Sequence, residues 1–200
     1  MPNQYPQIVL ASASPRRREL LASVGIQFQV IPSNIDEIQQ PDEKPEDFVL
    51  RLSREKAAEV AQRSTVSGRW FIGSDTIVQC DDHILGKPDS REDSASMLRM
   101  LSGRSHQVIS GYAILDRNTN QWLSRSITTD VTFRALTDHE IDGYIASGEP
   151  ADKAGSYAIQ GLGAFMVTTI NGSYSSVVGL PLAQIIDDLQ QLDAFDLFAK

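Results

Sequence analysis

The sequence predicts an α/β protein with a mixed, twisted central sheet that is flanked by helices. Short apolar runs bounded by turn residues alternate with stretches in which apolar residues recur at helical spacing. This alternation predicts strands that are connected through helices. Two long strand-like runs joined by a polar turn predict a β-hairpin as well, so we expect a mixed sheet. With 200 residues the chain can bury a large core, and we expect a single domain over residues 1–200, arranged as two lobes around a cleft.

The first strand and helix are predicted on either side of a short serine-rich turn. Ile8–Ala11 is apolar, Ser14 suits a helix N-cap and Pro15 suits the first helical position. Arg16–Arg18 then fall in the first turn, where the helix dipole disfavours cations by up to about 1 kcal/mol each. This charge indicates either a bound anion such as phosphate or a surface arginine cluster paired with acidic residues elsewhere.

The longest predicted helix covers residues 45–62, after a polar, exposed loop. Phe48, Leu52 and Val60 share one face of it, and Lys56 lies on that same face. A lysine in an apolar stripe either extends to the edge of the face or meets a buried anion. Both interpretations are open at this stage.

The strongest central strand is predicted over residues 70–78, and Asp75 interrupts its apolar run. A buried carboxylate is costly unless a metal, a cation or several hydrogen-bond donors compensate it. Asp75 is therefore either a functional carboxylate or one half of a structural ion pair with a cation of a neighbouring strand.

The second half of the chain continues the mixture of helices and strands. A glycine-rich stretch over residues 148–163 predicts a shaped loop that lines a site. The other predicted elements are a helix capped by Ser90 over 91–101, strands over 106–116 and 122–133, a helix with a Thr137 capping box to 146, a β-hairpin over 164–178 with its turn at Asn171-Gly172, and a last helix from Pro181.

The composition argues against several classes of partner. The 26 acidic residues outnumber the 18 basic ones, and the net charge of −8 disfavours binding to nucleic acid or to an anionic membrane. No apolar run reaches the roughly 18 residues of a membrane helix, and no signal peptide is recognisable. Cys80 is the only cysteine, which excludes an intrachain disulfide and fits a cytoplasmic location.

The candidate cations and carboxylates of this sequence, among them Arg17, Lys56 and Asp75, together suggest a site for a nucleoside polyphosphate bound with a divalent ion, Mg²⁺ or Mn²⁺. The chain has no Walker A motif, so a P-loop enzyme is disfavoured. His83, His106 and His139 lack the spacing of metal ligands. No nucleophile-elbow pattern is present, so metal-assisted attack by water is the simpler chemistry.

The candidate residues lie in motifs that resemble those of the Maf family, nucleoside triphosphate pyrophosphatases with an inosine-triphosphatase-like fold. The resemblance implies cleavage between the α- and β-phosphates, which gives a nucleoside monophosphate and pyrophosphate. The matching motifs are Ser12-Ala13-Ser14-Pro15-Arg16-Arg17, Asp36-Glu37, Arg54-Glu55-Lys56-Ala57, Gly73-Ser74-Asp75-Thr76, Gly86-Lys87-Pro88, Asp130-Val131-Thr132-Phe133, Ala154-Gly155-Ser156-Tyr157, Ile159-Gln160-Gly161 and Val178-Gly179-Leu180-Pro181.

Three positions separate the substrate branches of this family. Arg16, Thr76 and Gln160 match the branch that prefers dTTP and UTP, including modified uridine triphosphates. The branch that acts on 7-methyl-GTP has tryptophan, glutamine and glutamate at the corresponding places. A glutamine amide offers both a donor and an acceptor, which suits the imide edge of uracil or thymine.

The resemblance also implies roles within the site. Asp75 is the candidate general base or metal-proximal carboxylate, and Glu37 assists it at the metal. The alternative function is a nucleotide-sensing regulator of septum formation with little turnover; a homodimer and the identity of the metal are left open. The candidate substrate-binding residues are Ser14, Arg16, Arg17, Lys56, Thr76, Lys87 and Gln160.

Overall fold

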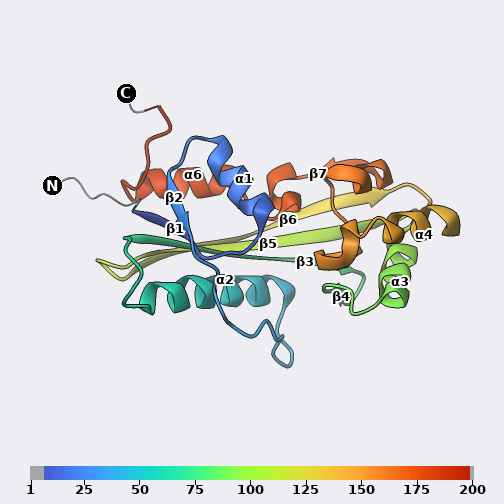
Figure 1. Ribbon diagram of the computed structural model, residues 1–200, viewed down its shortest axis with the longest axis horizontal. Coiled ribbons are helices and arrows are strands. Elements are labelled where there is room, and N and C mark those ends of the chain that lie inside the picture. The colour runs from blue at the N-terminus through green and yellow to red at the C-terminus, as the bar shows by residue number, and fades with distance from the viewer. Residues whose placement is uncertain (1–6, 199–200) are drawn as a thin grey trace. The chain divides into compact units, whose positions relative to one another are not determined.

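A computed structural model describes residues 7–198 and confirms the predicted mixed α/β class (Figure 1). Within these residues seven strands form one sheet in the order β2-β1-β3-β5-β6-β7, with β4 paired to β3. β1 is parallel to β2 and β3, whereas β4 is antiparallel to β3 and β7 to β6. The elements are β1 (Ile8–Leu10), α1 (Pro15–Ser23), β2 (Phe28–Val30), α2 (Pro45–Gln62), β3 (Trp70–Cys80), β4 (His83–Leu85), α3 (Arg91–Leu101), β5 (Ser105–Asp116), β6 (Gln121–Phe133), α4 (Asp138–Ala146), the 3₁₀ helices η1 (Glu149–Asp152), η2 (Ala154–Ser156) and η3 (Gly161–Met166), β7 (Val167–Asn171), α5 (Tyr174–Val178) and α6 (Leu182–Gln191).

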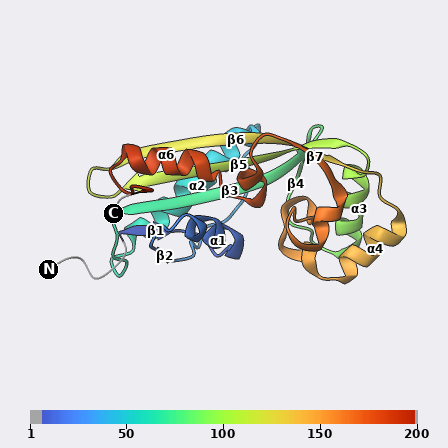
Figure 2. The same cartoon turned by 90° about the horizontal axis from the view of Figure 1, so that it is seen from above.

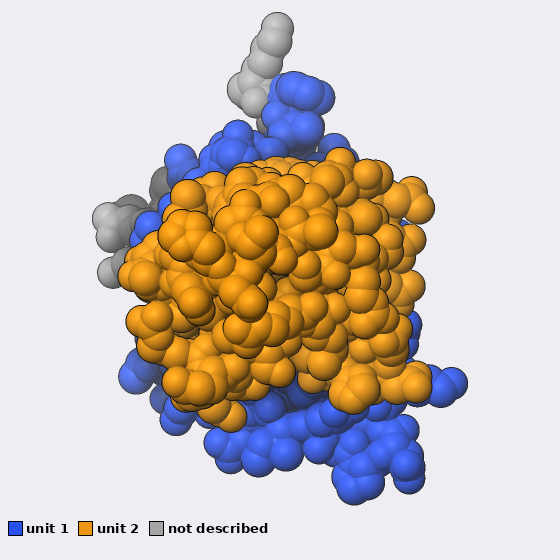
Figure 3. Space-filling model, turned by 90° about the vertical axis from the view of Figure 1, so that its right-hand side faces the viewer, with its two compact units in different colours: residues 1–75, 110–127, 179–200 blue, residues 76–109, 128–178 orange. Residues whose placement is uncertain are grey.

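The chain divides into two compact units, which Figure 3 shows in different colours. The first unit contains the described residues up to 75, residues 110–127 and those from 179 onward. The second contains residues 76–109 and 128–178, and β3, β5 and β6 contribute residues to both units. The cleft expected from the sequence is not tested by this division and stays a prediction.

The first unit buries both faces of its part of the sheet. Helix α2 covers one face, and α1 and α6 cover the other (Figures 1 and 2). Side chains of a strand point alternately to opposite faces, so neighbouring residues of β1 and β3 enter different cores. Ile8, Leu10, Trp70 and Ile72 pack on the α1 and α6 side, and Val9 and Phe71 pack on the α2 side.

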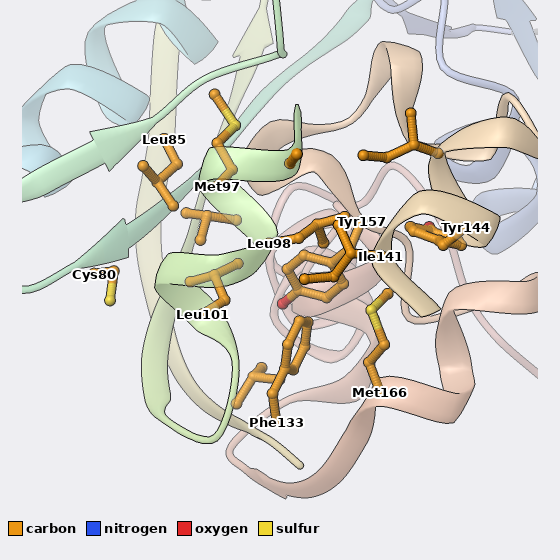
Figure 4. Packing of buried hydrophobic residues seen from close by; sticks show 14 of the residues in the cluster. Cys80, Leu85, Met97, Leu98, Leu101, Phe133, Ile141, Tyr144, Tyr157 and Met166 are labelled. Carbon is orange, nitrogen blue, oxygen red and sulfur yellow. The ribbon is translucent and has the colours of Figure 1, made fainter. Parts of the chain in front are cut away.

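The second unit has a separate core, part of which Figure 4 shows. Leu98 and Leu101 of α3, Phe133 of β6 and Tyr157 lie together in it. His106 is 3% exposed, and its Nε2 lies 2.8 Å from the hydroxyl oxygen of Tyr157. Burial lowers the pKa of His106 to about 4, so the ring is neutral at physiological pH.

Most predicted helix boundaries are confirmed, and side-chain caps mark the starts of α3 and α4. α2 covers the predicted residues 45–62. The Ser90 hydroxyl accepts from the backbone N–H of Asp93 at the start of α3, and Thr137 and Glu140 form the predicted capping box of α4. Within residues 7–198 no helix combines the length and apolarity needed to cross a lipid bilayer.

The predicted β-hairpin over residues 164–178 is wrong. η3 takes its first residues, β7 pairs with β6, and residues 174–178 form the short helix α5. The Ser173 hydroxyl accepts from the N–H of Ser176, and the Thr129 hydroxyl accepts from the N–H of Ser173. These side-chain bonds favour a helical turn after Gly172 in place of a returning strand.

Candidate functional site

One buried lysine connects two carboxylates in the first unit. Lys56 Nζ lies 2.6 Å from Glu37 Oε1 and 2.6 Å from Asp75 Oδ1. Lys56 is 5% exposed and Asp75 is 7% exposed. The lysine in the apolar face of α2 therefore meets a buried anion, which decides between the two interpretations of Lys56. The cation that pairs with Asp75 comes from helix α2, not from a neighbouring strand.

Two glycines allow α2 to lie close enough to the sheet for this contact. A Cβ atom added at Gly73 would lie 2.0 Å from the carbonyl oxygen of Ser53, and one at Gly111 would lie 2.7 Å from that of Val49. Any larger residue would force the helix away from the strands. Gly73 and Gly111 thus set the separation at which Lys56 of α2 reaches Asp75 of β3.

Arg17 ties three segments of the first unit together. Its Nε donates to the carbonyl of Gly179 at 2.8 Å, and its Nη1 donates to the carbonyl of Ser74 at 2.8 Å. Nη1 also lies 3.4 Å from the hydroxyl of Ser12. Because Ser74 directly precedes Asp75, these bonds hold the Arg17 guanidinium next to that carboxylate, inside the first unit.

The field at Arg17 comes from the same carboxylates that Lys56 contacts. Burial lowers the pKa of the Arg17 guanidinium from its ordinary value, and the negative charges of Asp75 and Glu37 oppose that shift. An arginine stays protonated under such conditions. The site therefore gathers two cations and two carboxylates within one unit.

The N-terminus of α1 is built as the sequence predicts. Ser14 is its N-cap and accepts a long hydrogen bond, 3.5 Å, from the N–H of Arg17, while Pro15 takes the first helical position. The hydroxyl of Ser12 accepts from the N–H of Ser14 at 3.2 Å. Arg16 is partly buried beside them and adds positive charge at Arg17.

The loop that carries Glu37 is fastened to α2 on both sides. Before Glu37, Arg63 donates to the carbonyl of Pro32 at 3.0 Å, and Glu59 accepts from the N–H of Asn34 at 3.0 Å. After it, Arg51 donates to the carbonyl of Ile38 at 2.9 Å. These bonds fix the backbone from which Glu37 reaches Lys56.

The two carboxylates fit a divalent cation that also binds phosphate. Glu37 Oε1 and Asp75 Oδ1 both lie against one nitrogen, so their separation cannot exceed the sum of the two distances above. Mg²⁺ commonly takes one or two carboxylates together with substrate phosphates. Among the described residues no group of three or more His, Cys, Asp or Glu side chains is placed to hold a metal ion.

Three candidate residues lie in the second unit. Thr76 is half-buried on β3, Lys87 is exposed after β4, and Gln160 is the N-cap residue of η3. The carbonyl of Gly86 accepts from the N–H of Gly155 at 3.0 Å, which joins the segment of Lys87 to the segment that leads to Gln160. The other candidates, Ser14, Arg16, Arg17, Glu37, Lys56 and Asp75, belong to the first unit.

Sequence reasoning missed Glu149, which organises the backbone after Gln160. Its carboxylate accepts from the N–H groups of Leu162 and Gly163, both at 2.9 Å. Its position directly after a helix-ending glycine in a glycine-rich stretch is the one signal that could have indicated it.

A family model described as Maf-like protein matches residues 7–192. The chain belongs to the Maf family. A "dTTP/UTP pyrophosphatase" of Syntrophotalea carbinolica is 59% identical over an alignment of 204 positions, which covers 100% of this chain and 93% of that relative. Proteins of the same name from Geobacter sulfurreducens and Escherichia coli O157:H7 are 53% and 50% identical, each over 94% of this chain and over 97% and 93% of the relative.

One solved structure is similar only at low level. A nucleoside-triphosphatase, dITP/XTP pyrophosphatase, from Mycobacterium abscessus is 15% identical with a TM-score of 0.39, over 70% of this chain and 93% of that chain.

Proposed function

We propose that this Maf protein is a pyrophosphatase that hydrolyses dTTP and UTP, and modified uridine triphosphates, to the nucleoside monophosphate and pyrophosphate. The observation that carries the proposal is the buried pair of Lys56 and Asp75, which the exposed Glu37 joins at the same ammonium, beside Arg17. The names of the relatives at 50–59% identity supply the substrate class.

The cluster has the charges that phosphoryl transfer needs. Asp75 is the proposed general base that takes a proton from the attacking water, with its oxygens aimed by the bond to Lys56. Lys56, Arg17 and Lys87 are proposed to bind the triphosphate and to stabilise charge that develops on the α-phosphoryl group. Ser14 is proposed to contribute at the N-terminus of α1.

We propose that Glu37 and Asp75 hold Mg²⁺ or Mn²⁺. When bound there, a divalent cation would polarise the phosphoryl oxygens and neutralise part of the phosphate charge. Lys56 would then exchange part of its pairing with the carboxylates for pairing with phosphate oxygens.

Arg16, Thr76 and Gln160 are the proposed base-selecting residues. A buried site that hydrogen-bonds a substrate group rejects analogues that lack it more strongly than an apolar pocket does. The amide of Gln160 can donate to a carbonyl and accept from the N3–H of a pyrimidine imide. It is therefore expected to favour dTTP and UTP over CTP and GTP.

Pyrophosphate release and nucleotide binding, measured side by side on purified protein, test the proposal. Wild type should release pyrophosphate from dTTP and UTP, and Asp75→Asn should bind dTTP while turnover falls by at least about 100-fold. Asp116→Asn is the matched control, because Asp116 is another buried strand aspartate of the first unit that is paired with an arginine, Arg69, at 2.7 Å.

Two results would contradict the proposal. Near-normal turnover of Asp75→Asn at saturating metal would remove Asp75 from the mechanism. Tight binding of dTTP by wild type without pyrophosphate release would instead support the nucleotide-sensing regulator.

A further inference from the structure

The carboxylate of Glu149 holds the start of η3. Its Oε2 accepts from the N–H of Leu162, and its Oε1 accepts from the N–H of Gly163, each at 2.9 Å. The first N–H groups of a helix have no partner within the helix, and an acceptor from outside must satisfy them. Glu149, from a different helix, supplies that acceptor.

Gln160 stands at the N-cap position of η3 but does not cap it. Its side chain makes no capping hydrogen bond, and its backbone is extended, with φ −94° and ψ 159°. N-cap side chains normally accept from the N–H two or three residues on. Because Glu149 performs this task, the amide of Gln160 is not required for it.

The backbone before Gln160 is held by the same network. The Tyr144 hydroxyl donates to Glu149 Oε1 at 3.0 Å and accepts from the N–H of Ala158 at 3.1 Å. Tyr144 itself is 2% exposed in the core of the second unit (Figure 4). Glu149 and Tyr144 thus fix the chain two residues before and two residues after Gln160.

Gly161 leaves room for this arrangement. Its φ of +75° lies in the left-handed region, and a Cβ there would lie 2.6 Å from Glu149 Oε2. Burial raises the pKa of Glu149, but the bonds from Gly163, Leu162 and Tyr144 outweigh it, and the pKa lies below its ordinary value. Glu149 is therefore ionised and fully engaged at neutral pH.

We infer that Glu149 is a positioning residue that sets base selectivity by holding the backbone on which Gln160 is mounted. This inference rests on the proposed function, in which Gln160 reads the base. It predicts that loss of the Glu149 carboxylate changes which nucleotide is hydrolysed, and not only how stable the protein is.

The test measures kcat/KM for dTTP, UTP, CTP and GTP in Glu149→Gln. Glutamine keeps the length of the side chain, but its amide NH₂ group is a donor. It would face the N–H and O–H groups that donate to the Glu149 carboxylate. The dTTP:GTP ratio of kcat/KM should fall by about tenfold, mainly through dTTP. Hydrogen exchange at the amides of Leu162 and Gly163 should accelerate in parallel.

Two further variants separate positioning from simple destabilisation. Asp93→Asn is the control, because Asp93 also accepts from a backbone N–H, that of Asp89 at 3.0 Å, in the same unit. It should leave the ratio unchanged. Tyr144→Phe should lower the ratio in the same direction, and its effect should not add to that of Glu149→Gln, because both act through one network.

Gln160→Ala, measured on the same panel of nucleotides, separates base reading by Gln160 from positioning by Glu149. A ratio that falls in Gln160→Ala but not in Glu149→Gln would overturn the inference and leave the proposed function standing. A dTTP:GTP ratio that does not change in Gln160→Ala would overturn base reading by Gln160, and with it the role of Glu149. The pyrophosphate-release assay tests separately whether the protein hydrolyses dTTP.

Discussion

Arg17→Ala is expected to destabilise the first unit. The substitution removes two hydrogen bonds of 2.8 Å from a charged donor to the carbonyls of Gly179 and Ser74. Each such bond contributes about 1.5–3 kcal/mol, whereas relief of the unfavourable helix-dipole interaction returns at most about 1 kcal/mol. A net loss of about 2–5 kcal/mol in the free energy of unfolding follows.

Urea denaturation followed by tryptophan fluorescence measures this loss without ligand. Both tryptophans, Trp70 and Trp122, belong to the first unit and report on it. With a denaturant slope of about 2 kcal/mol per molar, the midpoint should fall by about 1–2.5 M. Arg18→Ala is the control, because Arg18 is exposed in the same helical turn and shares the dipole contribution; it should leave the midpoint unchanged or raise it slightly. An Arg17→Ala midpoint equal to that of Arg18→Ala would refute the reasoning.

Three other outcomes follow from the same geometry. Lys56→Met leaves Glu37 and Asp75 without their shared cation; unfolding free energy at pH 8 should fall by about 3–5 kcal/mol and recover in part with added Mg²⁺, and a loss that Mg²⁺ does not change would contradict the carboxylate metal site. Gly73→Ala places a Cβ against the Ser53 carbonyl, so it should cost at least about 1–3 kcal/mol and abolish turnover, which thermal unfolding and pyrophosphate release would measure; normal turnover would show that the spacing of α2 is not critical. His106 has a folded pKa of about 4 against an ordinary 6.5, so below pH 6.5 the unfolded chain takes up a proton first and stability falls progressively until about pH 4. The full loss of unfolding free energy is about 3 kcal/mol, and this loss should be absent in His106→Gln. If the unfolding free energies of the two proteins change in parallel between pH 7.5 and 4.5, His106 is not the cause.

Features set by short-range chemistry were predictable from the sequence. The bounds of α2, the capping of α3 and α4 and the placement of Lys56 on a buried face all depend on residues within a few positions of one another. The apolar stripe around Lys56 left two interpretations open, and only the approach of β3 and of the loop with Glu37 decided between them.

Features that depend on distant partners were not predictable. The carbonyl that Arg17 contacts at Gly179 lies 162 positions away, and it is a backbone group that carries no residue-type signal. The first-turn arginines therefore showed from sequence only an unfavourable interaction with the helix dipole, and not the stabilising bonds to Gly179 and Ser74. The β-hairpin predicted from Asn171-Gly172 is absent for a related reason. The hydroxyl of Thr129, on strand β6, accepts from the N–H of Ser173.

Phosphorus NMR of dTTP incubated with the protein and Mg²⁺ shows directly which bond is cleaved. The mechanism built on Asp75, Glu37 and Lys56 predicts that the dTTP signals are replaced by those of dTMP and pyrophosphate in equal amounts, and that Asp75→Asn leaves dTTP intact over the same time. Formation of dTDP and inorganic phosphate, or dTTP that stays intact with the wild-type protein, would contradict the proposed activity.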